Sequence, residues 1–60
     1  METCTLINDE TGEKTVFLVD PLNVTVDFFI NETGQSHIMM NHTSAETLKE
    51  QLINKGFRVE

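Results

Sequence analysis

Residues 6–13 read Leu-Ile-Asn-Asp-Glu-Thr-Gly-Glu, and residues 28–35 repeat this pattern as Phe-Phe-Ile-Asn-Glu-Thr-Gly-Gln. In both copies an apolar segment leads into the same Glu-Thr-Gly tip, and a second apolar segment follows at residues 16–18 and 38–40. Apolar segments on both sides of a glycine-containing turn are typical of a β-hairpin. The repeat therefore predicts two hairpins in tandem, and the length of each turn decides how the strands pair.

Each tip starts with a residue that favours turns, Asp9 in the first and Asn31 in the second, and ends with glycine. A type I turn followed by a left-handed glycine gives a three-residue hairpin loop. Residues 20–23, Asp-Pro-Leu-Asn, fit the same geometry, because proline presets the second position and asparagine tolerates the left-handed one. Three such loops predict a four-stranded antiparallel meander with strands near residues 3–8, 14–20, 24–31 and 35–41.

Three-residue loops also fix which side chains share a face, because a slip of one residue turns a strand over. In this register the even-numbered residues of all the strands line one face, which is mostly apolar and is expected to form the core. The predicted core residues are Cys4, Leu6, Val16, Leu18, Val24, Val26, Phe28, Ile30, Ile38 and Met40. The odd-numbered face carries a second apolar patch with threonines at its rim. The partner-binding residues predicted on that face are Ile7, Phe17, Val19, Asp27, Phe29, His37 and Met39.

The last third of the chain changes to a helical period. Thr43 and Glu46 have the spacing of a capping box with Thr43 as the N-cap, and Gly56 is a typical left-handed stop. Between them, apolar residues recur at helical spacing. We predict a helix at about 44–55 and a tail at 57–60 that is either an edge strand or frayed. The expected fold is α+β, with a ββββα order in a single domain spanning residues 1–60.

One helix is roughly 10 Å wide, whereas four strands make a sheet nearly 20 Å across. A helix on the even face leaves the odd face without cover in these 60 residues. Apolar patches rich in aromatic and methionine side chains are typical of protein interfaces. An ordinary half-wet sheet face is the alternative. The sequence therefore predicts a small protein–protein interaction module that binds a protein partner or forms a homodimer through the odd face.

Asp27 lies at the centre of that patch and has two interpretations. It is either a solvated acid that discourages aggregation of an open sheet or an anchor for a basic residue of a partner. A different acidic surface is predicted at the hairpin tips, where Asp9, Glu10, Glu13 and Glu32 gather. The alternative function is an inhibitor or accessory protein of the mobile-element type that uses this surface to cover a basic, nucleic-acid-binding site. A solvated rim partly neutralised by Lys55 and Arg58 is the competing interpretation.

Composition excludes several function classes. Ten acids against four bases give a net charge of −6, which disfavours direct nucleic-acid binding. A single cysteine, the absence of an apolar run long enough for a membrane span, and the lack of a basic N-terminal leader favour a cytoplasmic protein. His37 and His42 fall on opposite sides of an extended strand, and Cys4 lacks a basic neighbour that would activate it. We expect no enzymatic activity, no cofactor, no metal and no membrane contact.

Overall fold

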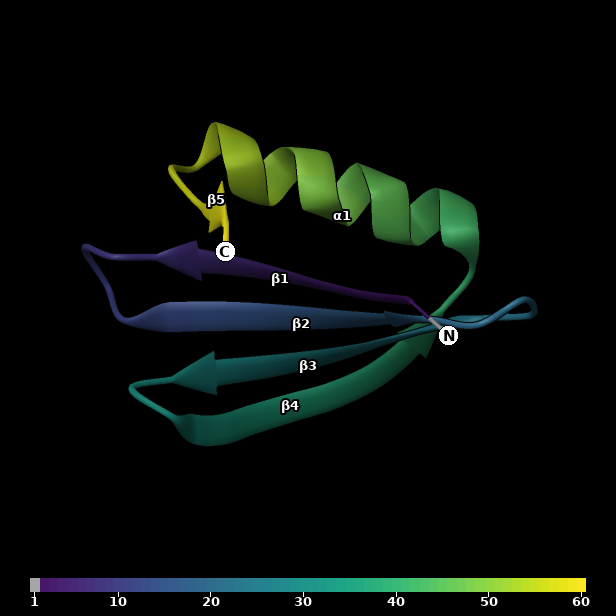
Figure 1. The fold of residues 1–60 in the computed structure, drawn as a ribbon, viewed down its shortest axis with the longest axis horizontal. Coiled ribbons are helices and arrows are strands. Elements are labelled where there is room, and N and C mark those ends of the chain that lie inside the picture. Colours follow the sequence, from purple (N-terminus) through teal and green to yellow (C-terminus); the bar gives the residue numbers. More distant parts are fainter. Residues whose placement is uncertain (1) are drawn as a thin grey trace.

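The computed structural model describes residues 2–60 and shows one antiparallel sheet with one helix packed on it (Figure 1). The sheet has five strands in the order β4-β3-β2-β1-β5. The elements in chain order are β1 (Glu2–Asn8), β2 (Glu13–Val19), β3 (Val24–Ile30), β4 (Thr33–Met40), α1 (His42–Asn54) and β5 (Arg58–Val59). The predicted antiparallel strands and the following helix are present, and the C-terminal tail adds a fifth strand.

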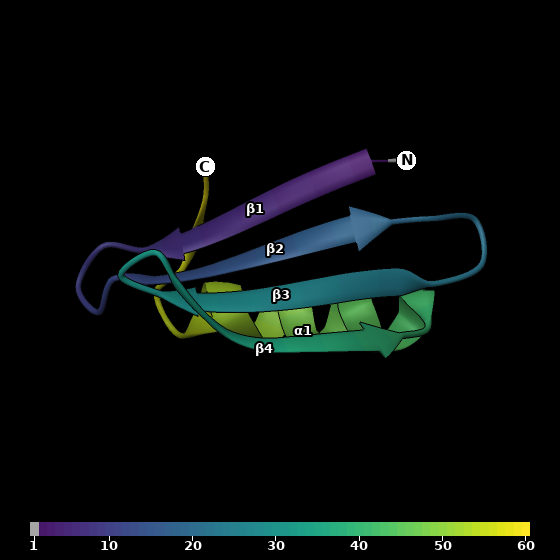
Figure 2. The same cartoon turned by 90° about the horizontal axis from the view of Figure 1, so that it is seen from below.

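The helix covers one face of the sheet only. In the view from below, β3 and β4 pass in front of α1 (Figure 2). After β4 the chain runs along the sheet as α1 and returns at the other edge, where Val59 is opposed to Leu6 and Arg58 to Ile7. At 13 residues, α1 is too short to cross a membrane, and the described part of the chain holds no helix that could.

The first hairpin loop has four residues, 9–12, instead of the predicted three, because Asn8 is opposed to Glu13. The side-chain oxygen of Asn8 accepts hydrogen bonds from the main-chain N–H groups of Glu10 at 3.0 Å and Thr11 at 3.4 Å. Gly12 has the expected left-handed φ of 76°. Asn8 rather than Asp9 therefore starts the turn. The additional loop residue turns β2 over relative to the prediction.

The second loop also has four residues, 20–23, because Val19 is opposed to Val24. The main-chain N–H of Asp20 donates to the carbonyl oxygen of Asn23 at 2.9 Å. This additional residue reverses the effect of the first, so β3 faces the way the sequence predicted. Of the four long strands, β2 alone has its faces exchanged.

The third loop has two residues, Asn31 and Glu32, whose φ values are 48° and 70°. Two successive positive φ values are typical of a type I′ turn. Gly34 is not the left-handed residue that the sequence suggested; it lies in β4 opposite Phe29. A bulge then takes up Gln35, and pairing resumes with Ser36 opposite Phe28. The two Glu-Thr-Gly tips are similar in sequence but differ in backbone structure.

The core lies between α1 and the covered face of the sheet. Its buried hydrophobic residues are Leu6, Phe17, Val24, Val26, Ala45, Leu52 and Phe57, with Cys4, Val19, Phe28, Met40 and Leu48 packed against them. The prediction was wrong for β2: Phe17 is 2% exposed, whereas Val16 and Leu18 lie on the opposite face. Two predicted core residues near the β4 edge, Ile30 and Ile38, are exposed because the single helix does not reach over them.

The N-cap of α1 is Asn41 and not Thr43. The side chain of Asn41 accepts a hydrogen bond from the main-chain N–H of Ser44 at 2.7 Å. Thr43 is already inside the helix, which therefore begins about two residues earlier than its capping-box spacing suggested. Asparagine is among the best N-cap residues, so it competes effectively with a threonine two positions later.

The C-terminal end of α1 confirms the prediction. Gly56 has a φ of 104°, and its N–H donates to the carbonyl oxygen of Ile53 at 3.1 Å. The N–H of Phe57 donates to the carbonyl oxygen of Leu52 at 3.1 Å, and both of these side chains are in the core. These bonds form a Schellman motif with its hydrophobic contact. The motif redirects the chain so that β5 can pair with β1.

Candidate functional site

The candidate site is the sheet face turned away from α1, which we call the open face. Directly opposed residues of antiparallel strands point to the same side, so the pairing register assigns its members. They are Thr3, Thr5, Ile7, Lys14, Val16, Leu18, Thr25, Asp27, Phe29, His37 and Met39. Among residues 2–60, no second layer packs on this face.

The structure brings together most of the predicted partner-binding residues. Ile7, Asp27, Phe29, His37 and Met39 lie on the open face. Phe17 and Val19 do not, because β2 is turned over, and the sequence argument missed Lys14, Val16 and Leu18 in their place. The signal that could have identified them is the ability of Asn8 to start the first turn one residue early.

An Asp–His pair lies halfway along the strands of the open face, on its β3–β4 side. Asp27 on β3 is opposed to His37 on β4, and the imidazole Nδ1 lies within hydrogen-bonding distance of the Asp27 carboxylate. Because a carboxylate only accepts, Nδ1–H is the donor. The His37 side chain is 70% exposed and that of Asp27 is 25% exposed. Asp27 thus has a hydrogen-bonding neighbour within the chain, which the sequence analysis did not predict.

The end of the open face nearest the hairpin tips combines an aromatic ring with a cation. The Lys14 ammonium lies 5.6 Å from the centre of the Phe29 ring, in the range of a cation–π contact. Gly34, opposite Phe29, contributes no side chain. A shallow hollow of about 300 Å³ lies here, lined by Asp27, Phe28, Phe29, Gly34, Gln35, Ser36 and His37. The open face therefore has a depression beside the Asp–His pair.

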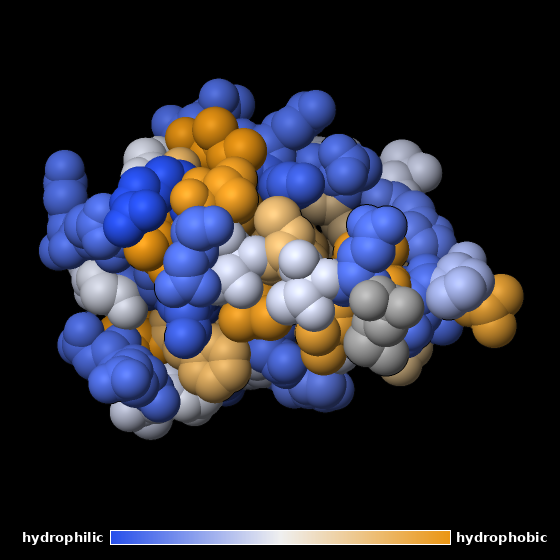
Figure 3. All heavy atoms as spheres, in the orientation of Figure 1, coloured by the Kyte–Doolittle hydropathy of each residue, from blue (hydrophilic) through white to orange (hydrophobic). Residues whose placement is uncertain are grey.

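A further apolar surface lies at the opposite edge of the sheet from β4. Figure 3 shows apolar side chains over the C-terminal end of α1 and over β5, with polar groups around them. Ile53 is 46% exposed and Val59 is 58% exposed on these two elements. This surface is smaller than the open face, which carries apolar residues on all four long strands.

The acidic hairpin tips lie side by side. The main-chain N–H of Asn31 donates to the carbonyl oxygen of Gly12 at 3.0 Å, which joins the two tips. A hollow of about 370 Å³ between them is lined by Ile7, Asn8, Asp9, Gly12, Glu13, Lys14, Asn31 and Glu32. The predicted acidic residues Asp9, Glu13 and Glu32 therefore meet at one site, together with the cation of Lys14.

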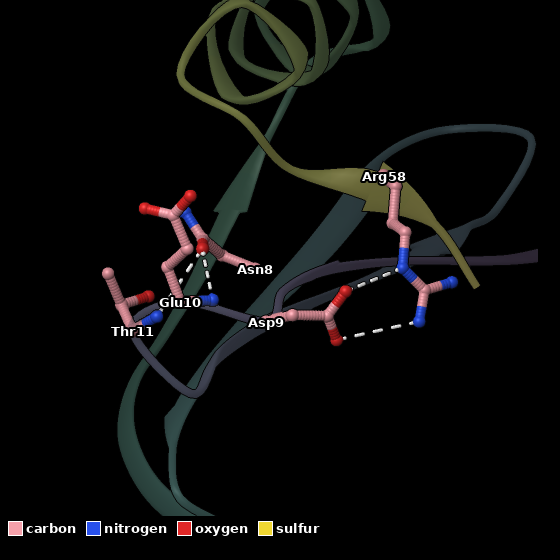
Figure 4. A network of polar contacts seen from close by, with 5 residues as sticks. All are labelled: Asn8, Asp9, Glu10, Thr11 and Arg58. Atoms are coloured by element: carbon pink, nitrogen blue, oxygen red, sulfur yellow. Dashed lines mark hydrogen bonds and ion pairs between the residues drawn. The ribbon is translucent and has the colours of Figure 1, made fainter.

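Arg58 reduces the negative charge of this end. Its Nε donates to a carboxylate oxygen of Asp9 at 2.8 Å, and a terminal nitrogen lies 3.5 Å from the other oxygen (Figure 4). The hydrogen bond and the charge of Arg58 hold the pKa of Asp9 below its usual value, and those of Asp9 raise the pKa of Arg58. The ion pair is exposed to solvent, so its contribution to stability is small.

The described residues contain no arrangement that points to metal binding. No group of three His, Cys, Asp or Glu residues in this part of the chain could hold a metal ion. Cys4 is a half-buried thiol packed against the core, and the imidazole Nε2 of His42 lies 2.7 Å from the carbonyl oxygen of Asp20. Comparison with protein-family models, with curated proteins and with solved structures finds no match for this chain.

Proposed function

We propose that this protein is a small non-catalytic interaction module that binds another protein through the open face. The supporting observation is that Ile7, Val16, Leu18, Phe29 and Met39 share a face that α1 does not cover. Apolar side chains that gather on one uncovered face, with polar groups around and among them, are typical of surfaces that become buried in a complex. The apolar side chains supply the binding energy, and the polar groups among them supply specificity.

The Asp27–His37 pair makes burial of this face less costly. A neutral polar group that loses water without gaining a hydrogen bond costs roughly 2–7 kcal/mol, and an unpaired carboxylate costs far more. Asp27 already has a donor in His37, so it keeps a hydrogen bond when a partner excludes solvent. The ring of His37 leaves Nε2 available for a polar group of the partner. The expected partner surface is therefore apolar, with a hydrogen-bonding group on the side that meets β4.

The size of the open face limits the area that a partner can bury on it. Four strands at about 4.8 Å spacing and roughly seven residues at about 3.3 Å give a face of about 440 Å² in projection. A standard interface buries about 800 Å² on each partner. A larger partner that also contacts the rim fits the available surface better.

The experiment is affinity capture from host cells with three forms of the full chain. Val16→Glu places a charge in the middle row of the open face, whereas Leu22→Glu places the same charge in the exposed β2–β3 loop. We expect the unchanged chain and Leu22→Glu to recover the same partner and Val16→Glu to lose it, with all three folded by circular dichroism. Recovery of that partner by Val16→Glu would contradict the proposal.

The acidic tips support a second candidate function, in which they cover a basic site on a larger protein. The observation in its favour is the bond between Asn31 and Gly12, which gathers acids from two hairpins at one end. Binding of this kind weakens steeply with added salt. Reversal of charge at Glu10, Glu13 and Glu32 should then abolish binding, whereas Val16→Glu should leave it intact. The opposite pattern favours the open face.

A further inference from the structure

Strand β4 is an open edge of the sheet along its whole length. Within residues 2–60 it pairs with β3 on one side and with no strand on the other. At the opposite edge, β5 covers Leu6 and Ile7, and the N–H of Glu60 donates to the carbonyl oxygen of Thr5. An uncovered edge strand presents a row of unpaired N–H and C=O groups to which another strand can add.

β4 also lacks the charged residues and proline that usually prevent edge pairing. Its eight residues, Thr33–Met40, include no Lys, Arg, Asp, Glu or Pro. The other long strands each carry a formal charge, for example Glu2 on β1, Lys14 on β2 and Asp27 on β3. The bulge at Gln35 distorts the end near the turn, but Ser36–Met40 stay in regular register. Long, uncharged edge strands are prone to pair with one another.

We propose that β4 pairs in antiparallel fashion with β4 of a second copy of this chain, which gives a dimer with one continuous sheet. Two chains that each carry a net charge of −6 repel one another, and β4 is the long strand through which they approach without bringing acids together. Antiparallel pairing of a strand with itself is two-fold symmetric, so it uses the same surface on both copies and closes at two.

The symmetry determines how the faces of the two sheets meet. Opposed side chains in an antiparallel pair lie on the same side, and a two-fold axis perpendicular to the sheet keeps each face on its own side. For an axis at His37, Ile38 or Met39, Ile38 of one copy lies directly opposite or diagonal to Ile38 of the other. The two helices then cover the same side of the dimer, and the two open faces adjoin on the other.

This arrangement doubles the area of the open face that a partner can contact. Two adjoining faces of about 440 Å² in projection give a continuous face of about 880 Å² in projection. The edge pairing itself does not depend on the proposed binding function. It adds to that function by defining a dimer as the unit that presents the binding surface.

The first test is amide hydrogen exchange of the unchanged protein at low and high concentration, with sedimentation equilibrium in parallel. In the monomer, every second amide of Ser36–Met40 points away from β3 and should exchange quickly. We expect these amides to gain about tenfold protection as the dimer forms, because they then donate to the second copy. A monomer at millimolar concentration, or a dimer whose β4 amides stay unprotected, overturns the proposal.

The second test uses opposite charges at the position nearest the axis. Ile38→Glu and Ile38→Lys should each weaken self-association about tenfold, because like charges face one another across the new pair of strands. An equimolar mixture should restore a heterodimer about as tight as the unchanged homodimer. Leu22→Glu and Leu22→Lys, which make the same changes of charge in the exposed β2–β3 loop, are the matched controls and should leave association unchanged. If neither Ile38 variant folds, the exchange experiment on the unchanged chain decides. Failure of the open-face function alone would leave both results as expected.

Discussion

The main-chain N–H of Asn31 donates a hydrogen bond to the carbonyl oxygen of Gly12 at 3.0 Å, so the tips of two hairpins support one another. Gly12 has a φ of 76°, and a Cβ added there would lie 2.1 Å from the side-chain oxygen of Asn31. Gly34 occupies the matching position in the sequence repeat, yet its nearest neighbour would be the Phe29 ring at 3.9 Å. The two glycines look equivalent in sequence but have different roles.

Gly12→Ala should therefore lower the free energy of unfolding by about 1–2 kcal/mol, since alanine is strained at positive φ and Asn31 must move. Gly34→Ala should change it by less than about 0.5 kcal/mol, because the added methyl makes an ordinary contact with Phe29. Urea unfolding of both variants measures the difference. Equal losses would mean that the two tips share one backbone geometry after all.

Glu32→Gly should stabilise the protein by about 1 kcal/mol. Glu32 has a φ of 70° at the second position of a type I′ turn, where Asn-Gly is the preferred sequence. Glycine relieves the strain of a side chain in the left-handed region. Glu10→Gly is the control, because Glu10 is also exposed in a hairpin loop but has no positive φ, and it should gain nothing. Thermal or urea unfolding gives both values.

Phe17→Ala should cost about 3–5 kcal/mol, a large part of the stability of so small a domain, because Phe17 is 2% exposed in the core. Leu18→Ala should cost less than about 1.5 kcal/mol, since Leu18 lies half-buried on the open face. Chemical unfolding of the two variants compares neighbouring positions of one strand. A larger loss for Leu18→Ala would indicate the register predicted from the sequence.

Asn41→Ala should destabilise the protein by about 1 kcal/mol through loss of the helix N-cap bond to Ser44. Thr43→Ala should have little effect, because Thr43 lies within the helix and does not cap it. The two unfolding free energies distinguish the observed helix start from the capping box expected at Thr43 and Glu46. A loss at Thr43 that exceeded the loss at Asn41 would contradict the observed start.

Arg58→Ala should raise the pKa of Asp9 towards its usual value, because the hydrogen bond and positive charge that lower it are removed. A carboxyl group whose pKa is lowered by folding stabilises the folded state above its usual pKa and loses this effect as the pH falls through the lowered value. The docking of β5 should accordingly loosen in acid. An NMR pH titration of the Asp9 carboxyl carbon measures the change, and Lys55→Ala should leave it unaltered.

Most of the fold could be predicted from local signals, because each has a short-range physical cause. The helix stop at Gly56 depends on a left-handed glycine and a contact between Phe57 and Leu52, all within a few residues. The first turn was harder, because Asn8 and Asp9 are both good turn starters and differ by one position. That one position decides which side of β2 faces the core.

The local pattern of β2 could not correct the error. Val16 and Leu18 on one side of the strand are as apolar as Phe17 and Val19 on the other, so alternation gives no preference. Which residues of β2 belong to the candidate site is therefore also ambiguous from the sequence. The residues contributed by β1, β3 and β4 could be placed on the open face from sequence, whereas those contributed by β2 could not.

The sequence by itself determined the strands and the helix, because apolar alternation, helical period and turn residues act over a few residues. The facing of β1, β3 and β4 also agreed with the prediction, although no loop has the predicted three residues: the two four-residue loops offset each other, and the bulge at Gln35 offsets the two-residue loop. The tertiary structure decided the facing of β2, because it is Phe17, and not Val16 or Leu18, that is buried in the core under α1. It also decided that the tail joins β1 as β5 and that Asp27 meets His37, because both depend on the register between separate strands. That register also sets which surface of the molecule remains open for a partner.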